Sequence, residues 1–274
     1  IKDRIVAHIL NEAKSQGKID AKTTLIEASS GNTGTSVAMF AAIHQLACII
    51  VMPDKTSQEK ITLAKTFGAK VVLCPSDAPS SSEEYYTNKA ADLARSIKNS
   101  FTLDQYNNHA NIKAHYLSTA HEIDEQTQGH VDHIVGCAST GGTMTGIAQY
   151  FKEKSKDIKI TIADTQASIF KSYLDTGDIN NASLKPTIIE GAGKKYLPGC
   201  IDFNVIDQVI AIDDATALAT QKLAAMHEGI FVGLSAGVAL SAALQLCHQY
   251  TSDSPCTMVV IIADTGLKYL SKLS

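Results

Sequence analysis

The segment between residues 24 and 52, TLIEASSGNTGTSVAMFAAIHQLACIIVM, decides the fold. Residues 24–27 predict a short strand, residues 33–46 predict a helix, and residues 48–52 predict a buried strand that ends at Pro53. When a helix lies between two strands in the sequence, it usually connects them as parallel neighbours in one sheet. We therefore predict a parallel sheet with helices on both faces, in which residues 29–34 lead from the first strand into the helix.

The same alternation continues on both sides of this segment. Apolar residues at helical spacing predict a helix over residues 5–13, ended by Gly17. The other expected strands are 70–74, 133–137, 158–163, 209–212 and 258–262, and the other expected helices are 57–67, 83–98, 112–126, 143–154, 214–228 and 236–250. The pattern predicts two α/β units that meet near residues 105–111, with a ligand in a cleft at the carboxyl ends of the strands.

Composition excludes several classes of partner. The chain has 274 residues, of which 45% are hydrophobic, enough to bury a substantial core. The net charge is -4 and no run of Lys and Arg forms a basic stripe, so we expect no nucleic-acid partner. No apolar run is long enough for a bilayer, so we expect no membrane partner. The six cysteines contain no C-x-x-C pair, which favours free thiols in a reducing cytoplasm and no metal site.

Two loops have the composition of anion-binding sites. Each loop lies between an expected strand and an expected helix. The first consists of residues 29–34 and the second of Ser139-Thr140-Gly141-Gly142-Thr143. Hydroxyls and backbone N–H groups at a helix N-terminus bind anions, and glycines let a ligand approach the backbone. The second loop matches neither a Walker loop nor a dinucleotide fingerprint. Each loop alone also fits an ordinary capped turn, but a ligand with two anionic ends would need such a pair.

Two further residues have both a structural and a functional interpretation. Ser235, in Gly-Leu-Ser-Ala-Gly, is either the N-cap of the helix that follows or a hydroxyl that faces a ligand. Lys2 lies in the first turn of the first helix, where a lysine is either solvated or functional.

The order of these motifs resembles the β-family (fold type II) of enzymes that depend on pyridoxal 5'-phosphate (PLP). Within it, the chain is similar to the cysteine synthase and cystathionine β-synthase group, and the similarity covers the whole chain. The matching pieces, in order, are Ile1-Lys2-Asp3-Arg4, Ser-Gly-Asn-Thr-Gly, Asp104-Gln105-Tyr106, Ala114-His115-Tyr116, Thr-Gly-Gly-Thr, Ile189-Glu190-Gly191-Ala192-Gly193, Asp207-Gln208-Val209-Ile210, Glu228-Gly229, Gly-Leu-Ser-Ala-Gly and Asp264-Thr265-Gly266. The Asp-Gln-Tyr and Ala-His-Tyr pieces favour the cystathionine β-synthase branch.

The resemblance implies a role for each matching residue. Lys2 matches the catalytic lysine that binds the cofactor covalently, and Asn32 the residue that bonds the cofactor's ring hydroxyl. Ser235 matches the hydroxyl that faces the pyridine nitrogen. The implied phosphate loop consists of Ser139, Thr140, Gly141, Gly142 and Thr143. The implied substrate-binding residues are Ser29, Ser30, Gly31, Thr33 and Gln105 around the carboxylate, with Gly191, Ala192 and Gly193 lining the substrate side.

The resemblance also implies a fold and an activity. The expected architecture is two doubly wound three-layer α/β domains, of the type of the tryptophan synthase β-subunit, with PLP in the cleft between them. Residues 5–108 would form the smaller domain with the carboxylate loop, and residues 109–274 the larger domain with the phosphate loop. The strands and helix that normally precede the lysine motif are not in this chain. The implied activity, in a cytoplasmic homodimer, is replacement of the β-substituent of a serine-type amino acid by a sulfur nucleophile.

Several alternatives stay open. The donor could be L-serine, O-acetylserine or O-phosphoserine, and the nucleophile could be sulfide or homocysteine. A serine or threonine dehydratase of the same fold would carry out β-elimination alone. A catalytically silent protein would keep the fold as a binding module. The intact Lys2, Asn32, phosphate loop and Ser235 favour an enzyme.

Two adjacent lysines depart from the pattern of the cystathionine branch, which usually has an acidic residue after the glycine loop. Lys194 and Lys195 follow Gly193. Cations beside the substrate would attract an anionic donor or nucleophile, an effect that salt screens. Alternatively, both are ordinary solvated surface lysines.

Overall fold

The computed structural model describes residues 1–79, 81–180, 184–250 and 255–273, and its contacts divide the chain into two units. Residues 1–104 and the C-terminal segment from Lys268 onward belong to the first unit, and Gln105–Leu267 form the second. The domain boundary expected after residue 108 thus differs by four residues from this division, and the C-terminal segment, expected in the second domain, groups with the first.

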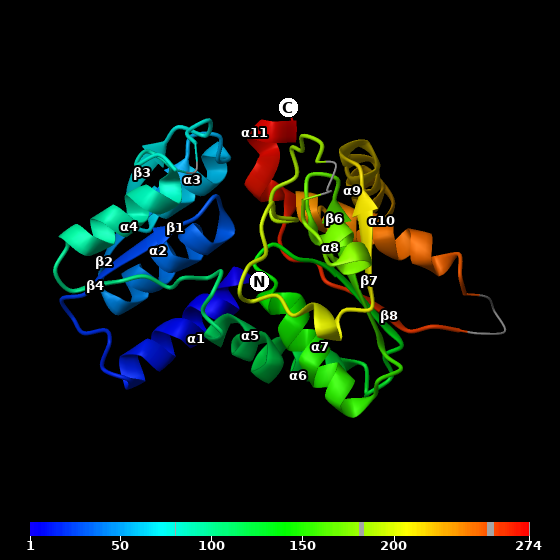
Figure 1. Ribbon diagram of the computed structural model, residues 1–274. Helices are drawn as coiled ribbons and strands as arrows, with labels where there is room; N and C mark the ends of the chain where they lie inside the picture. The colour runs from blue at the N-terminus through cyan, green and yellow to red at the C-terminus, as the bar shows by residue number, and fades with distance from the viewer. Residues whose placement is uncertain (80, 181–183, 251–254, 274) are drawn as a thin grey trace. The chain divides into compact units, whose positions relative to one another are not determined.

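The first unit contains a parallel four-stranded sheet in the order β3-β2-β1-β4 (Figure 1). Helices α2 and α4 pack against β1 and β2, and α1 packs against α2. The elements are α1 (Lys2–Ser15), β1 (Thr24–Ala28), α2 (Asn32–His44), β2 (Ala47–Pro53), α3 (Gln58–Thr66), β3 (Lys70–Cys74), α4 (Tyr86–Ser96) and β4 (Ser100–Phe101).

The second unit repeats the design with a parallel sheet in the order β7-β6-β5-β8. Its elements are α5 (Ala110–Ala114), a π-helical turn (His115–Thr119), α6 (Ala120–Gln126), β5 (His133–Cys137), α7 (Gly142–Lys154), β6 (Lys159–Thr165), α8 (Phe170–Thr176), a 3-10 turn (Phe203–Val205), β7 (Gln208–Ile212), α9 (Asp214–Glu228), α10 (Leu234–Cys247) and β8 (Met258–Val260). A 3-10 turn (Gly266–Tyr269) and α11 (Leu270–Leu273) follow.

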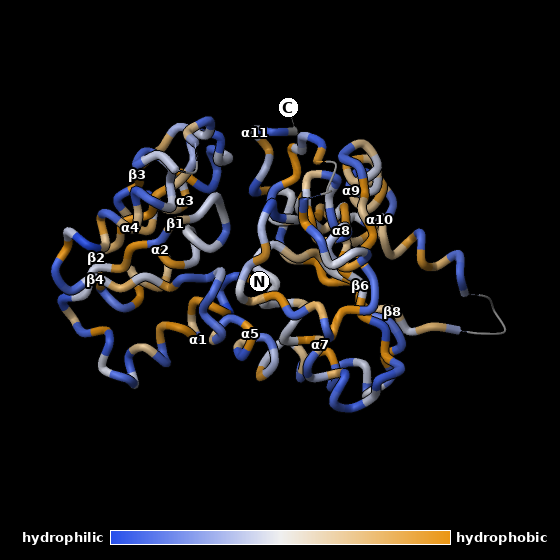
Figure 2. The backbone as a smooth tube through the Cα atoms, in the orientation of Figure 1, coloured by the Kyte–Doolittle hydropathy of each residue, from blue (hydrophilic) through white to orange (hydrophobic). Residues whose placement is uncertain are grey.

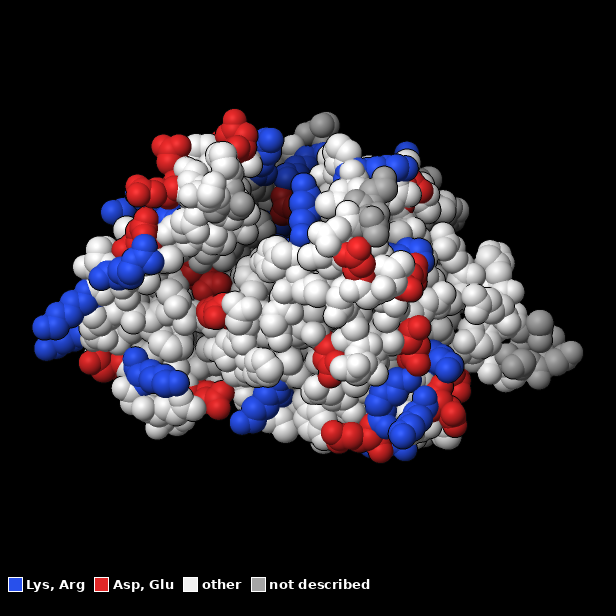
Figure 3. Space-filling model, viewed as in Figure 1, with Lys and Arg blue, Asp and Glu red and all other residues white. Residues whose placement is uncertain are grey.

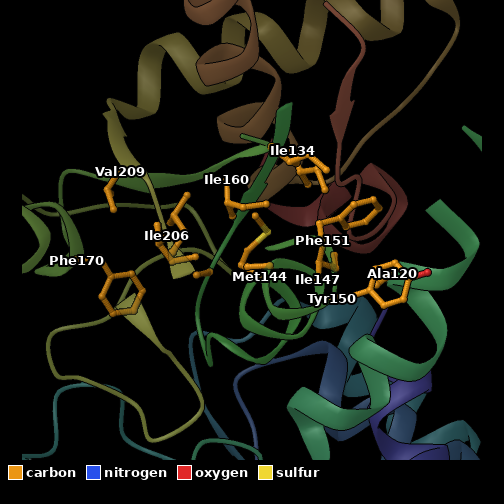
Figure 4. Packing of buried hydrophobic residues seen from close by; sticks show 14 of the residues in the cluster. Ala120, Ile134, Met144, Ile147, Tyr150, Phe151, Ile160, Phe170, Ile206 and Val209 are labelled. Atoms are coloured by element: carbon orange, nitrogen blue, oxygen red, sulfur yellow. The ribbon is translucent and has the colours of Figure 1, made fainter. Parts of the chain in front are cut away.

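Apolar packing holds each sheet to its helices. In the second unit, Met144, Ile147 and Phe151 of α7 pack with Ile134 and Ile160 of the sheet, and all five are at most 1% exposed (Figure 4). Helix α10, hydrophobic along most of its length in Figure 2, packs against β5, β6, β7 and β8. A smaller core in the first unit is built from four buried residues, Ile26, Val51, Cys74 and Ala90. These cores fix where the strands end, and the loops at those ends carry the candidate site.

The expected strand–helix alternation is confirmed. The bounds of β3, β5 and α9 agree with the sequence prediction at both ends. The helix expected over residues 112–126 is interrupted by the π-helical turn, which begins at the buried His115. Helix α8 was not predicted, because seven residues make less than two turns and show no clear periodicity.

Candidate active site

The loop after β1 is arranged around the hydroxyl of Ser29. Ser29 Oγ accepts hydrogen bonds from the backbone N–H of Gly31 (3.2 Å) and of Gly34 (3.0 Å). Gly31 is the N-cap of α2 and supplies no capping side chain. A Cβ atom on Gly34 would lie 2.7 Å from Ile50 Cγ2, so the helix start can pack this closely on β2 only with glycine there. The result is a closely packed helix N-terminus, whose positive end favours an anion.

Asn32, the first residue of α2, contacts the C-terminal segment of the chain. Lys268 Nζ donates a hydrogen bond of 3.1 Å to Asn32 Oδ1. An ammonium group has only donors, so this bond directs the amide oxygen of Asn32 toward Lys268 and its NH₂ group the other way.

Lys2 is the first residue of α1, and its side chain is half-buried. The neighbouring Asp3 accepts a hydrogen bond from Ser36 of α2, which fixes the start of α1 against α2. The short lysine motif and the Ser-Gly-Asn loop are therefore parts of one packed unit.

The second glycine loop lies after β5 and opens α7. Gly141, the N-cap, has φ 88°, a left-handed conformation that favours glycine. A Cβ atom there would lie 2.4 Å from Ile201 Cβ, and one on Gly142 would lie 2.2 Å from Asn111 Oδ1. The loop therefore presents backbone rather than side chains at the N-terminus of a 13-residue helix.

Both threonine hydroxyls of this loop are held by buried residues of the preceding helices. Asn111 Nδ2 donates to Thr140 Oγ1 (3.1 Å) and to the backbone oxygen of Gln105 (2.8 Å). His115 Nε2 shares a hydrogen bond of 3.0 Å with Thr143 Oγ1, while its Nδ1 shares one of 2.8 Å with Thr119 Oγ1. Asn111 and His115 are fully buried. The π-helical turn thus begins at the residue that orients Thr143.

Ser235 is buried in the first turn of α10. A Cβ atom on Gly191, which has φ 87°, would lie 3.4 Å from Ser235 Oγ, so the glycine loop passes directly beside this hydroxyl. Gly193 N donates to the backbone oxygen of Ala138 (2.7 Å), which ties the same loop to the end of β5. The structure therefore brings Ser235, Gly191 and Gly193 to the edge of the sheet where the Thr140 loop begins.

A buried carboxyl that the sequence analysis missed lies behind the Gly193 loop. Asp164 of β6 has no exposed surface, and a Cβ atom on Gly193 would lie 2.9 Å from its Oδ1. Burial raises the pKa of the Asp164 carboxyl to about 7, although hydrogen bonds from Ser168 and from the backbone of Thr165 act in the opposite direction. No sequence pattern marked it, because strands buried on both faces show no alternation.

The two lysines after the glycine loop differ in environment. Lys194 is half-buried, its Nζ donates to the hydroxyl of Tyr106 (2.9 Å), and it lies 4.6 Å from the centroid of the Tyr106 ring. Lys195 is exposed. On the face shown in Figure 3, Lys and Arg are interspersed with Asp and Glu rather than gathered in a stripe.

The donors of the second unit fit a phosphorylated cofactor. A phosphate requires hydrogen-bond donors and positive potential. The second unit offers two oriented hydroxyls, a glycine loop whose neighbours leave no room for a Cβ atom, and the positive end of α7. The described residues contain no group of three or more His, Cys, Asp or Glu arranged to hold a metal ion, and no described helix has the length and apolar character to cross a membrane.

Comparison with known proteins gives the family. The model of the family described as "Pyridoxal-phosphate dependent enzyme" matches residues 1–264, and the chain belongs to this family of PLP-dependent enzymes.

Its relatives include cystathionine beta-synthases. The chain is 39% identical to the cystathionine beta-synthase of Apis mellifera over 99% of its own length and 53% of the relative's, and 36% identical to that of Oryctolagus cuniculus over 99% and 48%. The chain therefore spans about half the length of the curated relatives it matches.

Solved structures agree with this assignment. An O-acetylserine dependent cystathionine beta-synthase from Helicobacter pylori matches with a TM-score of 0.89 and 32% identity, over 99% of this chain and 84% of that one. A hydrogen sulfide-producing enzyme from Fusobacterium nucleatum matches with a TM-score of 0.89 and 33% identity, over 98% and 87%. The expected α/β fold of type II is confirmed.

Because of Asp164, the stability of the folded protein is predicted to depend on pH. Because the pKa of this carboxyl is about 7 in the folded chain and 3.8 for an unperturbed aspartate, the folded protein binds more protons than the unfolded one between these values. Its stability should therefore fall as the pH rises from about 4 to about 7. Asp164→Asn should remove this pH-dependent contribution, on the order of 2–4 kcal/mol, as measured by urea unfolding of the cofactor-saturated protein at pH 5 and pH 8.

The matched control is Asp157→Asn, which changes an exposed aspartate in the same unit. If Asp164→Asn kept the pH dependence of the parent, the Asp164 carboxyl would have an ordinary pKa and no such effect on stability.

Proposed function

We propose that this chain binds PLP through Lys2 and replaces the β-substituent of a serine-type amino acid with a sulfur nucleophile. The observation that most supports this class of reaction is the position of Ser235. Its neutral hydroxyl lies beside the Gly191 loop, in the unit that also contains the candidate phosphate-binding loop at residues 139–143. When bound, PLP supplies an electron sink that labilises groups at Cα and Cβ. A hydroxyl beside the pyridine nitrogen does not protonate the ring as a carboxylic acid would, which favours loss of the β-substituent over transamination.

Each group of residues has its own task in this proposal. The hydroxyls of Thr140 and Thr143 and the amides at the start of α7 bind the phosphate, with Ser139, Gly141 and Gly142 shaping the loop. The NH₂ group of Asn32, directed away from Lys268, donates to the ring hydroxyl of the cofactor. Lys2 is displaced by the substrate amine, takes the Cα proton and returns it after the nucleophile has added.

The carboxylate of the substrate belongs, in this proposal, to the loop at the start of α2. Ser30, Gly31 and Thr33 lie at that helix end, and Ser29 holds the loop closed with its hydroxyl oxygen. Gln105 is assigned to the same carboxylate, and Gly191, Ala192 and Gly193 to the substrate side. The donors and nucleophiles proposed are L-serine, O-acetylserine or O-phosphoserine with sulfide or homocysteine. Of the related compounds, the names of the relatives mention O-acetylserine, cystathionine and hydrogen sulfide.

We extend the proposal to a cytoplasmic homodimer that acts on small molecules. The support for the compartment is that the six cysteines are free thiols, five of them buried or half-buried: Cys48, Cys74, Cys137, Cys200 and Cys256.

The proposed reaction is tested with the cofactor-loaded protein and its Lys2→Ala variant. We expect the parent to show the visible absorption of a lysine-bound cofactor, and to form cystathionine with homocysteine or cysteine with sulfide, identified by product mass. Lys2→Ala should lose this absorption and about 10²–10⁴-fold of the turnover, the usual effect of removing a general base. Pyruvate as the sole product, with or without a thiol, would instead indicate β-elimination, and absence of any cofactor band in the parent would reject the enzyme proposal.

Lys268→Met should weaken PLP binding by removing the donor that orients Asn32. If the Asn32 amide can rotate freely, its hydrogen bond to PLP is weakened by on the order of 1 kcal/mol. We therefore expect about five- to tenfold weaker binding in a fluorescence titration with PLP. Lys268→Arg retains a cationic donor and should restore most of the affinity. Equal affinity in the parent and in Lys268→Met would mean that Lys268 does not orient Asn32.

Lys194 should select anionic co-substrates, and Lys195 should not. Lys194 is held against Tyr106, the neighbour of Gln105, whereas Lys195 faces solvent. We expect Lys194→Met to lower kcat/KM for O-phosphoserine selectively, with a difference from O-acetylserine that shrinks at high salt. Lys195→Met is the matched control and should change neither. A loss of the same size for both donors would remove Lys194 from substrate selection.

A further inference from the structure

Lys60 is a buried charge to which neither the sequence motifs nor the proposed mechanism assigns a role. It lies in the first turn of α3 and is 1% exposed. Burying an ammonium group is unfavourable unless nearby groups compensate it, so a lysine in such a place has a reason to be there.

One compensating group is an aromatic ring from the other end of the chain. Lys60 Nζ lies 3.9 Å from the centroid of the Tyr269 ring, and Tyr269 is itself 1% exposed. A cation over the face of a ring is attracted most strongly where water is excluded from both. The contact therefore holds the ammonium group in one place.

The segment that carries Tyr269 is anchored to the same turn of α3. Ser57 Oγ donates to the backbone oxygen of Lys268 (2.8 Å). Glu59 accepts from the backbone N–H and from the hydroxyl of Ser271, each at 2.7 Å. Three neighbouring residues, at positions 57, 59 and 60, thus hold the C-terminal segment on both sides of the ring.

The ammonium group of Lys60 lies beside Gly31, in the loop that is proposed to bind the carboxylate. A Cβ atom on Gly31 would lie 3.1 Å from Lys60 Nζ and 3.3 Å from its Cδ. Gly31 is the N-cap of α2, so the positive charge of Lys60 adds to the positive end of that helix. The backbone of Gly31 cannot move toward α3 without meeting the lysine.

We propose that Lys60 is a positioning residue that fixes the Gly31 backbone and increases the affinity of the loop for the substrate carboxylate through its buried positive charge. This inference rests on the proposed function, which places the carboxylate at this loop. The charge acts across one layer of backbone, in surroundings that exclude water, where Coulomb interactions are stronger than in solution. Tyr269 and the C-terminal segment then serve to keep the ammonium group at the loop.

The test compares two ligands that differ only in the carboxylate. L-Alanine has no β-leaving group and binds without turnover, and L-alaninamide replaces its carboxylate by a neutral amide. The dissociation constant of each is measured from the change in cofactor absorption, in the full chain saturated with PLP. We expect Lys60→Met to weaken L-alanine binding about ten- to a hundredfold and L-alaninamide binding about twofold or less.

Three further variants control the comparison. Lys60→Arg keeps the charge and should retain most of the affinity, and Tyr269→Leu, which keeps the lysine but removes the ring, should show a smaller loss for L-alanine alone. Lys65→Met, on the exposed side of the same helix, should bind both ligands as the parent does. Tyr269→Leu also serves as the test if Lys60→Met does not fold.

The outcomes separate the two proposals. Equally weaker binding of both ligands to Lys60→Met, or to Tyr269→Leu where that variant is the test, would show a general structural effect. Unchanged binding of L-alanine would show that Lys60 does not affect the carboxylate. Either result overturns the role of Lys60 and leaves the proposed function in place. If the parent itself gave no cofactor absorption change with L-alanine, the proposed function would fail first.

Discussion

The candidate site of this protein depends on the positive N-terminal ends of two helices, α2 and α7. In a parallel sheet, each strand leads through a short loop into a helix whose first turn has no internal acceptors. The N-cap residues are glycines, Gly31 and Gly141, which have no side chain, and in the first turn of α2 the hydroxyl of Ser29 accepts from the N–H of Gly34. In the proposed function, each unit presents one such helix end to an anion, and the other proposed site residues either shape or support these ends.

The supporting residues differ between the two units. In the second unit, the side chains of Asn111 and His115 orient the hydroxyls of Thr140 and Thr143 through hydrogen bonds. In the first unit, support comes from cations: Lys268 bonds Asn32, and Lys60 lies beside Gly31.

Much of this could be predicted from sequence, because the features concerned are local. The strand–loop–helix order, the glycine loops and the hydroxyl of Ser235 are each visible within about ten residues. The supporting contacts are not local. Asn111 and Thr140 are 29 positions apart, His115 and Thr143 are 28 apart, and Lys60 and Tyr269 are 209 apart. Asp164 was missed for another reason, since a polar residue in a buried strand gives no periodic signal.

The roles of the loops came from a resemblance, and the geometry gives each role a physical basis. The proposal on which the other roles depend is that the start of α7 binds the phosphate of the cofactor. It is tested most directly by comparing the binding of PLP with that of pyridoxal, which lacks the phosphate, in the parent and in Gly141→Val. A side chain at position 141 would meet Ile201 and displace the loop. We expect the parent to prefer PLP strongly and Gly141→Val to lose this preference, whereas a variant that still preferred PLP as the parent does would place the phosphate elsewhere.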